Sequence, residues 1–158
     1  MKALLPLAVL GTACNGQKSE TKKAPRVDPD RVTVDHILIG VRGKMPTVTR
    51  TKEEAKELAD QIVARLKAGE DWAALKNEYS DDPAPKPGEP KGGPYAMDVN
   101  QPRRDMAKIT AGQYAKDDMA PGFADTSFSL DVGEIAIAPY DKSNNRSPFG
   151  FHIIKRIK

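Results

Sequence analysis

Cysteine and histidine are both scarce in this chain of 158 residues, which has one of the former and two of the latter. The single cysteine, Cys14, excludes a disulfide within the chain and leaves no thiol for catalysis in the part that we expect to fold. The formal net charge of +3 is too small a bias to indicate a nucleic-acid-binding protein. His36 and His152 are therefore the first candidates for a functional site.

Residues 1–13 resemble a bacterial lipoprotein signal sequence. Lys2 supplies a basic start, residues 3–10 are mostly apolar, and small residues precede Cys14. The apolar run is too short to remain as a membrane-spanning helix. We predict a signal peptide over residues 1–13 and lipidation of Cys14, which would hold an exported protein on a membrane of the bacterial cell envelope, on the periplasmic side in a Gram-negative cell. The alternative is an ordinary secretory signal followed by an incidental cysteine.

Residues 14–31 have the composition of a flexible tether. They contain several lysines and two prolines, and almost no aliphatic side chain apart from Val27. Such a segment cannot bury enough apolar area to offset the loss of conformational entropy on ordering. The folded domain is therefore expected over residues 32–158.

Hydrophobic patterns in this domain predict a mixed α+β fold. A strand is expected over residues 32–41, with Val32, Val34, His36 and Leu38 on one face. Thr51 and Glu54 have the spacing of a capping box, which predicts a helix start. Further elements are expected as helices over 51–68, 71–79 and 123–129 and as strands over 132–137 and 151–157. Helices grouped between strands favour a mainly antiparallel sheet.

Two segments of the domain carry no helix or strand pattern. Residues 83–93 contain four prolines and three glycines, which predicts a loop. Residues 98–118 are polar and have no clear period, so we interpret them as an insertion of unknown use.

Eight short motifs together resemble the parvulin family of peptidyl-prolyl cis/trans isomerases. In the order of the family they are 36–39 (HILI), 49–55 (TRTKEEA), 69–72 (GEDW), 79–82 (YSDD), 92–93 (GG), 123–125 (FAD) with 128–130 (FSL), 133–135 (GEI) and 149–154 (FGFHII). The resemblance implies a four-stranded antiparallel sheet surrounded by about four helices. Residues 94–97 (PYAM) depart from the family, which has an acidic residue, leucine, glycine and an aromatic after the glycine pair.

The resemblance also implies a set of site residues. His36 and His152 would form an imidazole pair in a hydrogen-bond network, and Asp82 lies where the family has cysteine or aspartate. The other candidates are Met119 and Phe123 as the pocket for the proline ring, Tyr95 as an altered wall of that pocket, and Ser147 as the hydroxyl before the last strand.

Each candidate also has an ordinary structural alternative. Met119 and Phe123 could be core residues, and the two histidines could be satisfied by partners within the sheet. Asp82 could merely cap the turn before Pro83, a common position for aspartate.

The resemblance implies a non-covalent prolyl isomerase that needs no metal or cofactor and acts as a monomer on proline-containing exported polypeptides. One alternative is a membrane-tethered peptide-binding chaperone with this fold and little or no isomerase activity, which the altered residues 94–97 support. Another is a metal protein that uses both histidines with Asp82, although nothing in their spacing demands it. The phosphate-reading basic cluster of one branch of the family is only partly present, as Arg42 and Lys44.

Overall fold

The computed structural model describes residues 29–84, 88, 91–102 and 113–158. The expected signal peptide, Cys14 and nearly all of the expected tether lie outside these residues. The strands are β1 (Arg31–Gly40), β2 (Pro94–Asp98), β3 (Gln113–Ala115), β4 (Ile135–Ala138) and β5 (Gly150–Arg156). The helices are α1 (Lys52–Lys67), α2 (Trp72–Tyr79) and α3 (Pro121–Ser129), with short 3-10 turns η2 (Lys116–Asp118) and η3 (Ser143–Asn145).

The strands form one sheet in the order β3-β2-β1-β5-β4. All neighbours are antiparallel except β2 and β3, which run parallel. The expected α+β class is therefore confirmed, but the described part of the chain has five strands and three α-helices instead of four of each. The fifth strand, β3, lies within residues 98–118, for which the polar sequence without a clear period predicts an insertion and no strand. In addition, β1 begins at Arg31, which was assigned to the tether.

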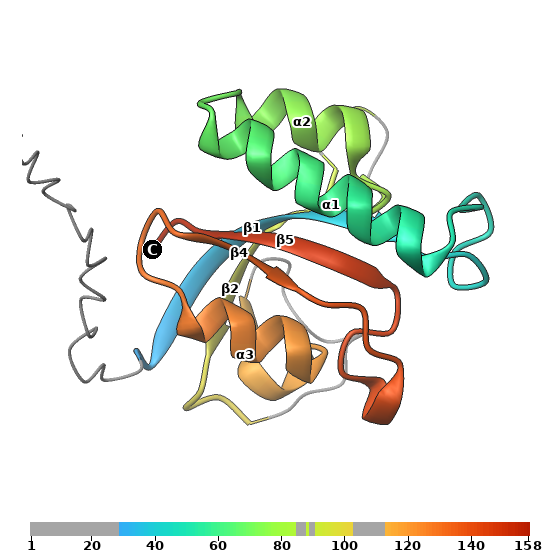
Figure 1. Ribbon diagram of the computed structural model, residues 1–158. Coiled ribbons are helices and arrows are strands. Elements are labelled where there is room, and N and C mark those ends of the chain that lie inside the picture. Colours follow the sequence, from blue (N-terminus) through green and yellow to red (C-terminus); the bar gives the residue numbers. More distant parts are fainter. Residues whose placement is uncertain (1–28, 85–87, 89–90, 103–112) are drawn as a thin grey trace, which may run out of the picture.

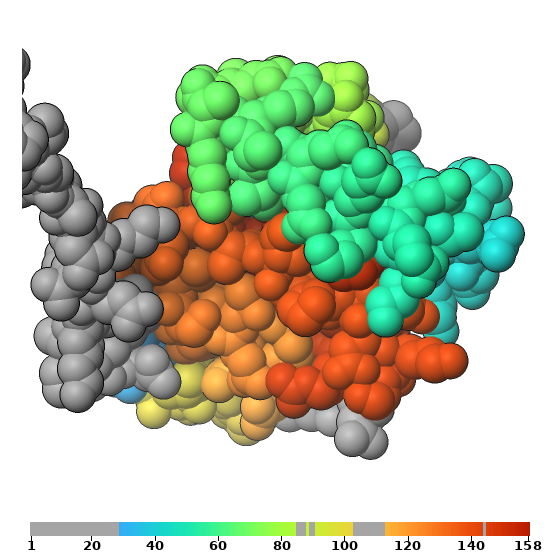
Figure 2. Space-filling view, in the orientation of Figure 1, coloured from blue at the N-terminus to red at the C-terminus, as the bar shows by residue number. Residues whose placement is uncertain are grey.

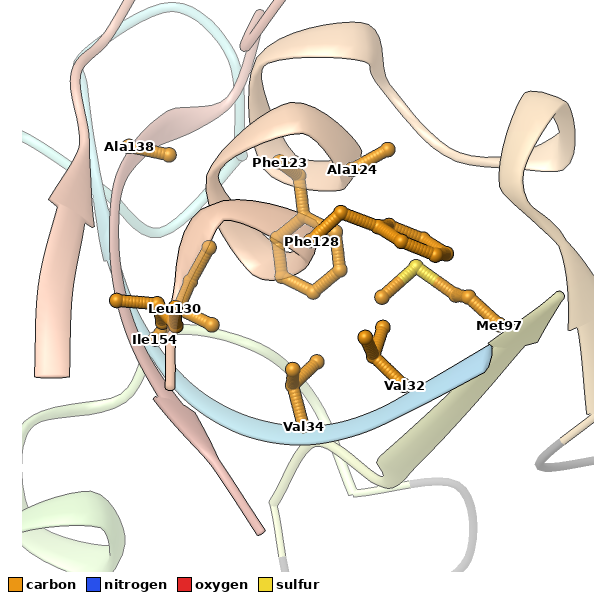
Figure 3. Close-up of a cluster of buried hydrophobic side chains, with 9 residues drawn as sticks. All are labelled: Val32, Val34, Met97, Phe123, Ala124, Phe128, Leu130, Ala138 and Ile154. Atoms are coloured by element: carbon orange, nitrogen blue, oxygen red, sulfur yellow. The ribbon is translucent and has the colours of Figure 1, made fainter. Parts of the chain in front are cut away.

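The sheet lies between two layers of helices. Figure 1 shows α1 and α2 on one side of the strands and α3 on the other. Because side chains alternate along a strand, Ile37 and Ile39 of β1 pack in the cluster with α1 and α2. Val32 and Val34 pack instead with α3, as Figure 3 shows. The shared face predicted for alternate residues of β1 is therefore confirmed.

Helix α1 begins where its sequence pattern predicts. Thr51 is the N-cap, and its hydroxyl accepts a hydrogen bond from the Glu54 amide at 3.2 Å, while the Glu54 carboxylate accepts from the Thr51 amide at 2.8 Å. This reciprocal capping box satisfies two amides that lack partners within the helix. In Figure 2 the green side chains of α1 and α2 form a ridge above the orange and red residues of the last third of the chain. No helix in the described ranges is long and apolar enough to cross a membrane.

Candidate active site

A cavity of about 480 Å³ opens on the sheet face that α3 covers. Its lining includes six of the seven candidate site residues, namely His36, Asp82, Tyr95, Met119, Phe123 and His152. Ser147 is not among the lining residues. The chain thus brings together side chains from the three neighbouring strands β2, β1 and β5, from helix α3 and from two loops.

Strand register places the two histidines beside each other. Leu38 of β1 lies directly opposite His152 of β5, so His36 and His152 are diagonal neighbours on one face. Their ring centroids are 5.3 Å apart, and the ring planes meet at 45°. His36 is 3 % exposed and His152 is 8 % exposed, so both imidazoles belong to the floor of the cavity.

Asp82 reaches His36 because the segment before it docks on the edge of β1. Strand β2 pairs only with residues 31–35 of β1, which leaves the later part of that edge free. There the Asp81 amide donates to the Leu38 carbonyl at 2.8 Å, and the Leu38 amide donates to the Ser80 hydroxyl at 3.2 Å. This docking places Asp82 Oδ2 3.3 Å from His36 Nε2.

Aromatic rings enclose the His36 imidazole. The Tyr95 and Phe123 rings both lie with their centroids 5.3 Å from that of His36, and they are 5.8 Å from each other. The Tyr95 hydroxyl donates to Asp82 Oδ2 at 3.4 Å. Tyr95 therefore lines the cavity and also contributes a polar group beside Asp82.

Residues 17–157 of the chain match the family described as the PPIC-type PPIASE domain. The chain belongs to this family. The match confirms the resemblance to the parvulin isomerases that the eight motifs indicated.

Curated relatives and solved structures agree with this assignment. Chaperone SurA of Chromohalobacter salexigens is 34% identical over 140 residues, which cover 89% of this chain and 24% of that protein. Foldase protein PrsA of Halalkalibacterium halodurans is 31% identical over 101 residues, covering 64% of this chain and 23% of that protein. The chain thus spans about a quarter of the length of these curated relatives.

The similarity in structure concerns the fold alone. Peptidyl-prolyl isomerase ESS1 from Candida albicans superposes with a TM-score of 0.54 at 23% identity, covering 82% of this chain and 63% of that one. The solution structure of TbPIN1 gives the same TM-score at 19% identity, covering 82% of this chain and 98% of that one.

The electrostatics of the PPIC-type site depend on the burial of its polar groups. Burial alone raises the pKa of the Asp82 carboxyl, but the hydrogen bond and charge of His36 outweigh it, so this pKa lies below its usual value. Burial, followed by the Asp82 charge, raises the pKa of the Tyr95 hydroxyl well above its usual value. At neutral pH the site therefore holds a carboxylate and a protonated phenol that donates to it.

His152 is a neutral imidazole at physiological pH. Burial is the main cause that lowers its pKa to about 3, with a smaller contribution from the nearby His36. Neither of its ring nitrogens has a hydrogen-bond partner in the part of the chain that the structure describes.

We predict that the PPIC-type domain loses stability as the pH falls from about 6.5 toward about 3. In this window the unfolded chain binds a proton at His152 and the folded domain does not, so unfolding takes up a proton. This group alone lowers the free energy of unfolding by up to about 1.4 kcal/mol per pH unit. Asp82 adds to the loss at the acidic end, because its lowered pKa also stabilises the fold only while the carboxyl stays ionised.

Chemical denaturation at a series of pH values checks this prediction. A His152→Phe variant removes the group and keeps a buried ring. Its stability is expected to depend less steeply on pH between 6.5 and 4, and the same slope in both proteins would contradict the assignment to His152.

Ser147 has a different place from the other candidates. Its side chain is fully buried and its hydroxyl donates to the Gly150 carbonyl at 3.0 Å, so it holds the turn that leads into β5. Cys14, the predicted lipidation site, lies outside the described residues.

Several residues of the cavity were not expected from the sequence. Met45 and Pro46 of the loop after β1 line it, and so does Phe149, which is 51 % exposed at its rim. The available signal was an aromatic residue directly before the predicted last strand. Within the described ranges, no group of three or more His, Cys, Asp or Glu side chains is arranged to hold a metal ion.

Proposed function

We propose that this PPIC-type domain accelerates the cis/trans isomerisation of X-Pro bonds in polypeptides without covalent chemistry. The observation that carries the proposal is the apolar wall of Met119 and Phe123 beside the His36–Asp82 contact, all in one cavity. Rotation of an amide faces a barrier of about 18–20 kcal/mol because it breaks resonance. No bond is made or lost, so a catalyst needs only to bind the twisted amide better than either planar form.

The proposed site favours the twisted amide in two ways. The apolar wall seats the proline ring and excludes water, while the preceding residue stays free to rotate. The Asp82 carboxylate, held by His36 and Tyr95, repels the carbonyl oxygen of the substrate. That oxygen is more negative in the planar amide than in the twisted one, so repulsion raises the free energy of the planar state more.

A peptide assay tests the proposal. We expect the purified domain to increase the rate of isomerisation of proline peptides, which takes tens to hundreds of seconds without a catalyst. A Met119→Ala variant is expected to have a kcat/KM about tenfold lower, equivalent to about 1.4 kcal/mol of lost contact with the transition state. The control is Val132→Ala, which changes a side chain that is 66 % exposed and does not line the cavity, and it should leave the rate unchanged.

A second candidate function is peptide binding with little or no turnover. The polar Tyr95–Asp82 contact within the apolar pocket favours it, as does the similarity to proteins named a chaperone and a foldase. Rates at background in the assay above, together with measurable binding of the same peptides, would support this function in place of isomerisation.

The proposed setting is the cell envelope of a bacterium. Residues 1–13 and Cys14 support export and lipid anchoring, and residues 14–31 would then separate the membrane from the domain. The proposed clients are proline-containing unfolded or exported polypeptides, with the domain acting as a monomer. Slow prolyl isomerisation limits the folding of many chains, so a tethered catalyst at this place would act on newly exported proteins.

A further inference from the structure

An ion pair between a buried lysine and a partly buried aspartate lies on the sheet face opposite the cavity. Asp35 precedes His36 in β1, so its side chain points to the side that α2 covers. Lys76 of α2 is 7 % exposed, and its Nζ lies 2.6 Å from Asp35 Oδ1. The Trp72 indole nitrogen donates to Asp35 Oδ2 at 2.8 Å, and the His36 amide donates to Oδ1 at 2.8 Å. Removing the lysine and most of the aspartate from water costs desolvation free energy that pairing only partly recovers, so stability is a weak explanation for this pair.

Lys76 has a second contact, which leads to the cavity. Its Nζ donates to the Gly92 carbonyl at 3.1 Å. Gly92 is buried with φ at +54°, a conformation that favours glycine, and a methyl group on it would lie 2.9 Å from Asp82 Oδ2 and 3.3 Å from the His36 ring. The Gly92 backbone therefore packs directly against both partners of the His36–Asp82 contact.

Lys91, the residue before Gly92, is also held by a hydrogen bond. Lys91 Nζ donates to the Ser80 carbonyl at 2.9 Å, and the Ser80 hydroxyl accepts from the Asp82 amide at 3.3 Å. The backbone around Gly92 is thus tied to the segment that carries Asp82 and, through Lys76, to Asp35 beside His36. Among the hydrogen bonds of the described residues named here, only the one from Lys76 is made to Gly92 itself.

We propose that Lys76 is a positioning residue, which Asp35 holds in place and which keeps Gly92 packed against Asp82 and His36. Without the ammonium group, the Gly92 carbonyl loses a charged donor and the backbone is free to move away from the site. Asp82 and His36 then gain room, and the Nε2–Oδ2 contact of 3.3 Å is no longer enforced. The consequence for activity rests on the proposed isomerase function, whereas the consequence for the His36 ring does not.

The test combines ring spectroscopy with kinetics on a Lys76→Met variant. The 15N chemical shifts of the His36 ring, recorded at a pH at which this ring is neutral and assigned with the help of His152→Phe, report which nitrogen carries the proton. We expect the two His36 shifts to move toward each other in Lys76→Met, because the hydrogen bond to Asp82 no longer selects one tautomer. We also expect kcat to fall about tenfold with KM little changed, since the reacting groups are displaced more than the apolar pocket.

Two further variants serve as a positive and a negative control for the Lys76→Met measurement. Gly92→Ala pushes Asp82 and His36 apart directly, so it should change the His36 ring shifts in the same direction. Lys56→Met removes an exposed lysine whose Nζ lies 2.6 Å from Asp60, and it should change neither the shifts nor kcat.

The possible outcomes separate a positioning role from a structural one. A folded Lys76→Met protein with wild-type His36 shifts overturns the proposal, even if the yield of folded protein is lower. If Lys76→Met does not fold, Asp35→Asn takes its place, and unchanged ring shifts there overturn the proposal equally. If the wild-type domain has no isomerase activity, the proposed function fails, while the ring shifts still decide the role of Lys76.

Discussion

Replacement of Gly150 with alanine is expected to lower the free energy of unfolding by about 4 kcal/mol or more. Gly150 begins β5 and pairs with Gly40 of β1. A methyl group at this position would lie 2.1 Å from the Ile39 carbonyl oxygen and 2.8 Å from the Gly40 Cα. Both are backbone atoms of the central strand pair, so the clash is relieved only by separating β1 from β5. Since native domains are stable by only about 5–15 kcal/mol, this loss would remove a large share of the free energy of unfolding.

Urea denaturation followed by circular dichroism measures this effect. Alanine variants of two other glycines provide a comparison of the loss of stability. A methyl group on Gly40 meets only side-chain atoms, of Val48, Asp81 and Met45, at 3.0–3.3 Å, so Gly40→Ala should destabilise less. At Gly93 the nearest atoms belong to Tyr95 at 3.9 Å, and Gly93→Ala should change stability least. A Gly150→Ala protein as stable as Gly93→Ala would refute the close approach of β1 and β5 at this point.

Local patterns were sufficient to predict the elements that hold the two histidines. The alternation of apolar residues around His36 places the strand and its faces, because the period of two is a property of the strand itself. The capping box at Thr51 and the apolar stripe after it likewise place α1. These signals depend only on neighbours in the sequence, so the elements can be predicted without knowledge of the tertiary structure.

Strands β2 and β3 could not be predicted in the same way. Strand β2 begins with Pro94 after a glycine pair, a composition that indicates a turn, and β3 has only three residues. Both are strands because β1 offers a free edge to β2 and β2 offers one to β3. The pairing partner of β2 lies about sixty residues away along the chain, so the local pattern of β2 carries no signal of the pairing.

The candidate site, too, was predictable only in part from the sequence. The family resemblance implied six residues that the structure brings to one cavity, although their functional roles stay a prediction. The contact of Lys76 with the Gly92 carbonyl had no sequence signal, because it joins a helix on one side of the sheet to a loop that reaches the other. Ser147 was proposed as the hydroxyl before the last strand, and that hydroxyl donates within the turn before β5.

Replacement of Phe123 with alanine is expected to remove most of the isomerase activity proposed here. Phe123 is 3 % exposed, and its ring forms the wall of the cavity beside His36 and His152. Contact of the substrate proline with a buried aromatic ring contributes about 1.5–3 kcal/mol, so kcat/KM should fall about 10- to 100-fold. The variant should also lose about 3–5 kcal/mol of stability, because the ring belongs to the core cluster of Figure 3.

Phe128 provides the matched control for this loss of stability. It lies on the same helix α3, is also 3 % exposed and belongs to the same cluster, but it does not line the cavity. Phe128→Ala should therefore be destabilised by a similar amount and keep nearly the wild-type kcat/KM per folded molecule. If both alanine variants unfold, leucine at each position allows the same comparison at a smaller cost in packing. Equal losses of activity in the two folded variants would mean that the ring of Phe123 supports the fold and does not contact the substrate.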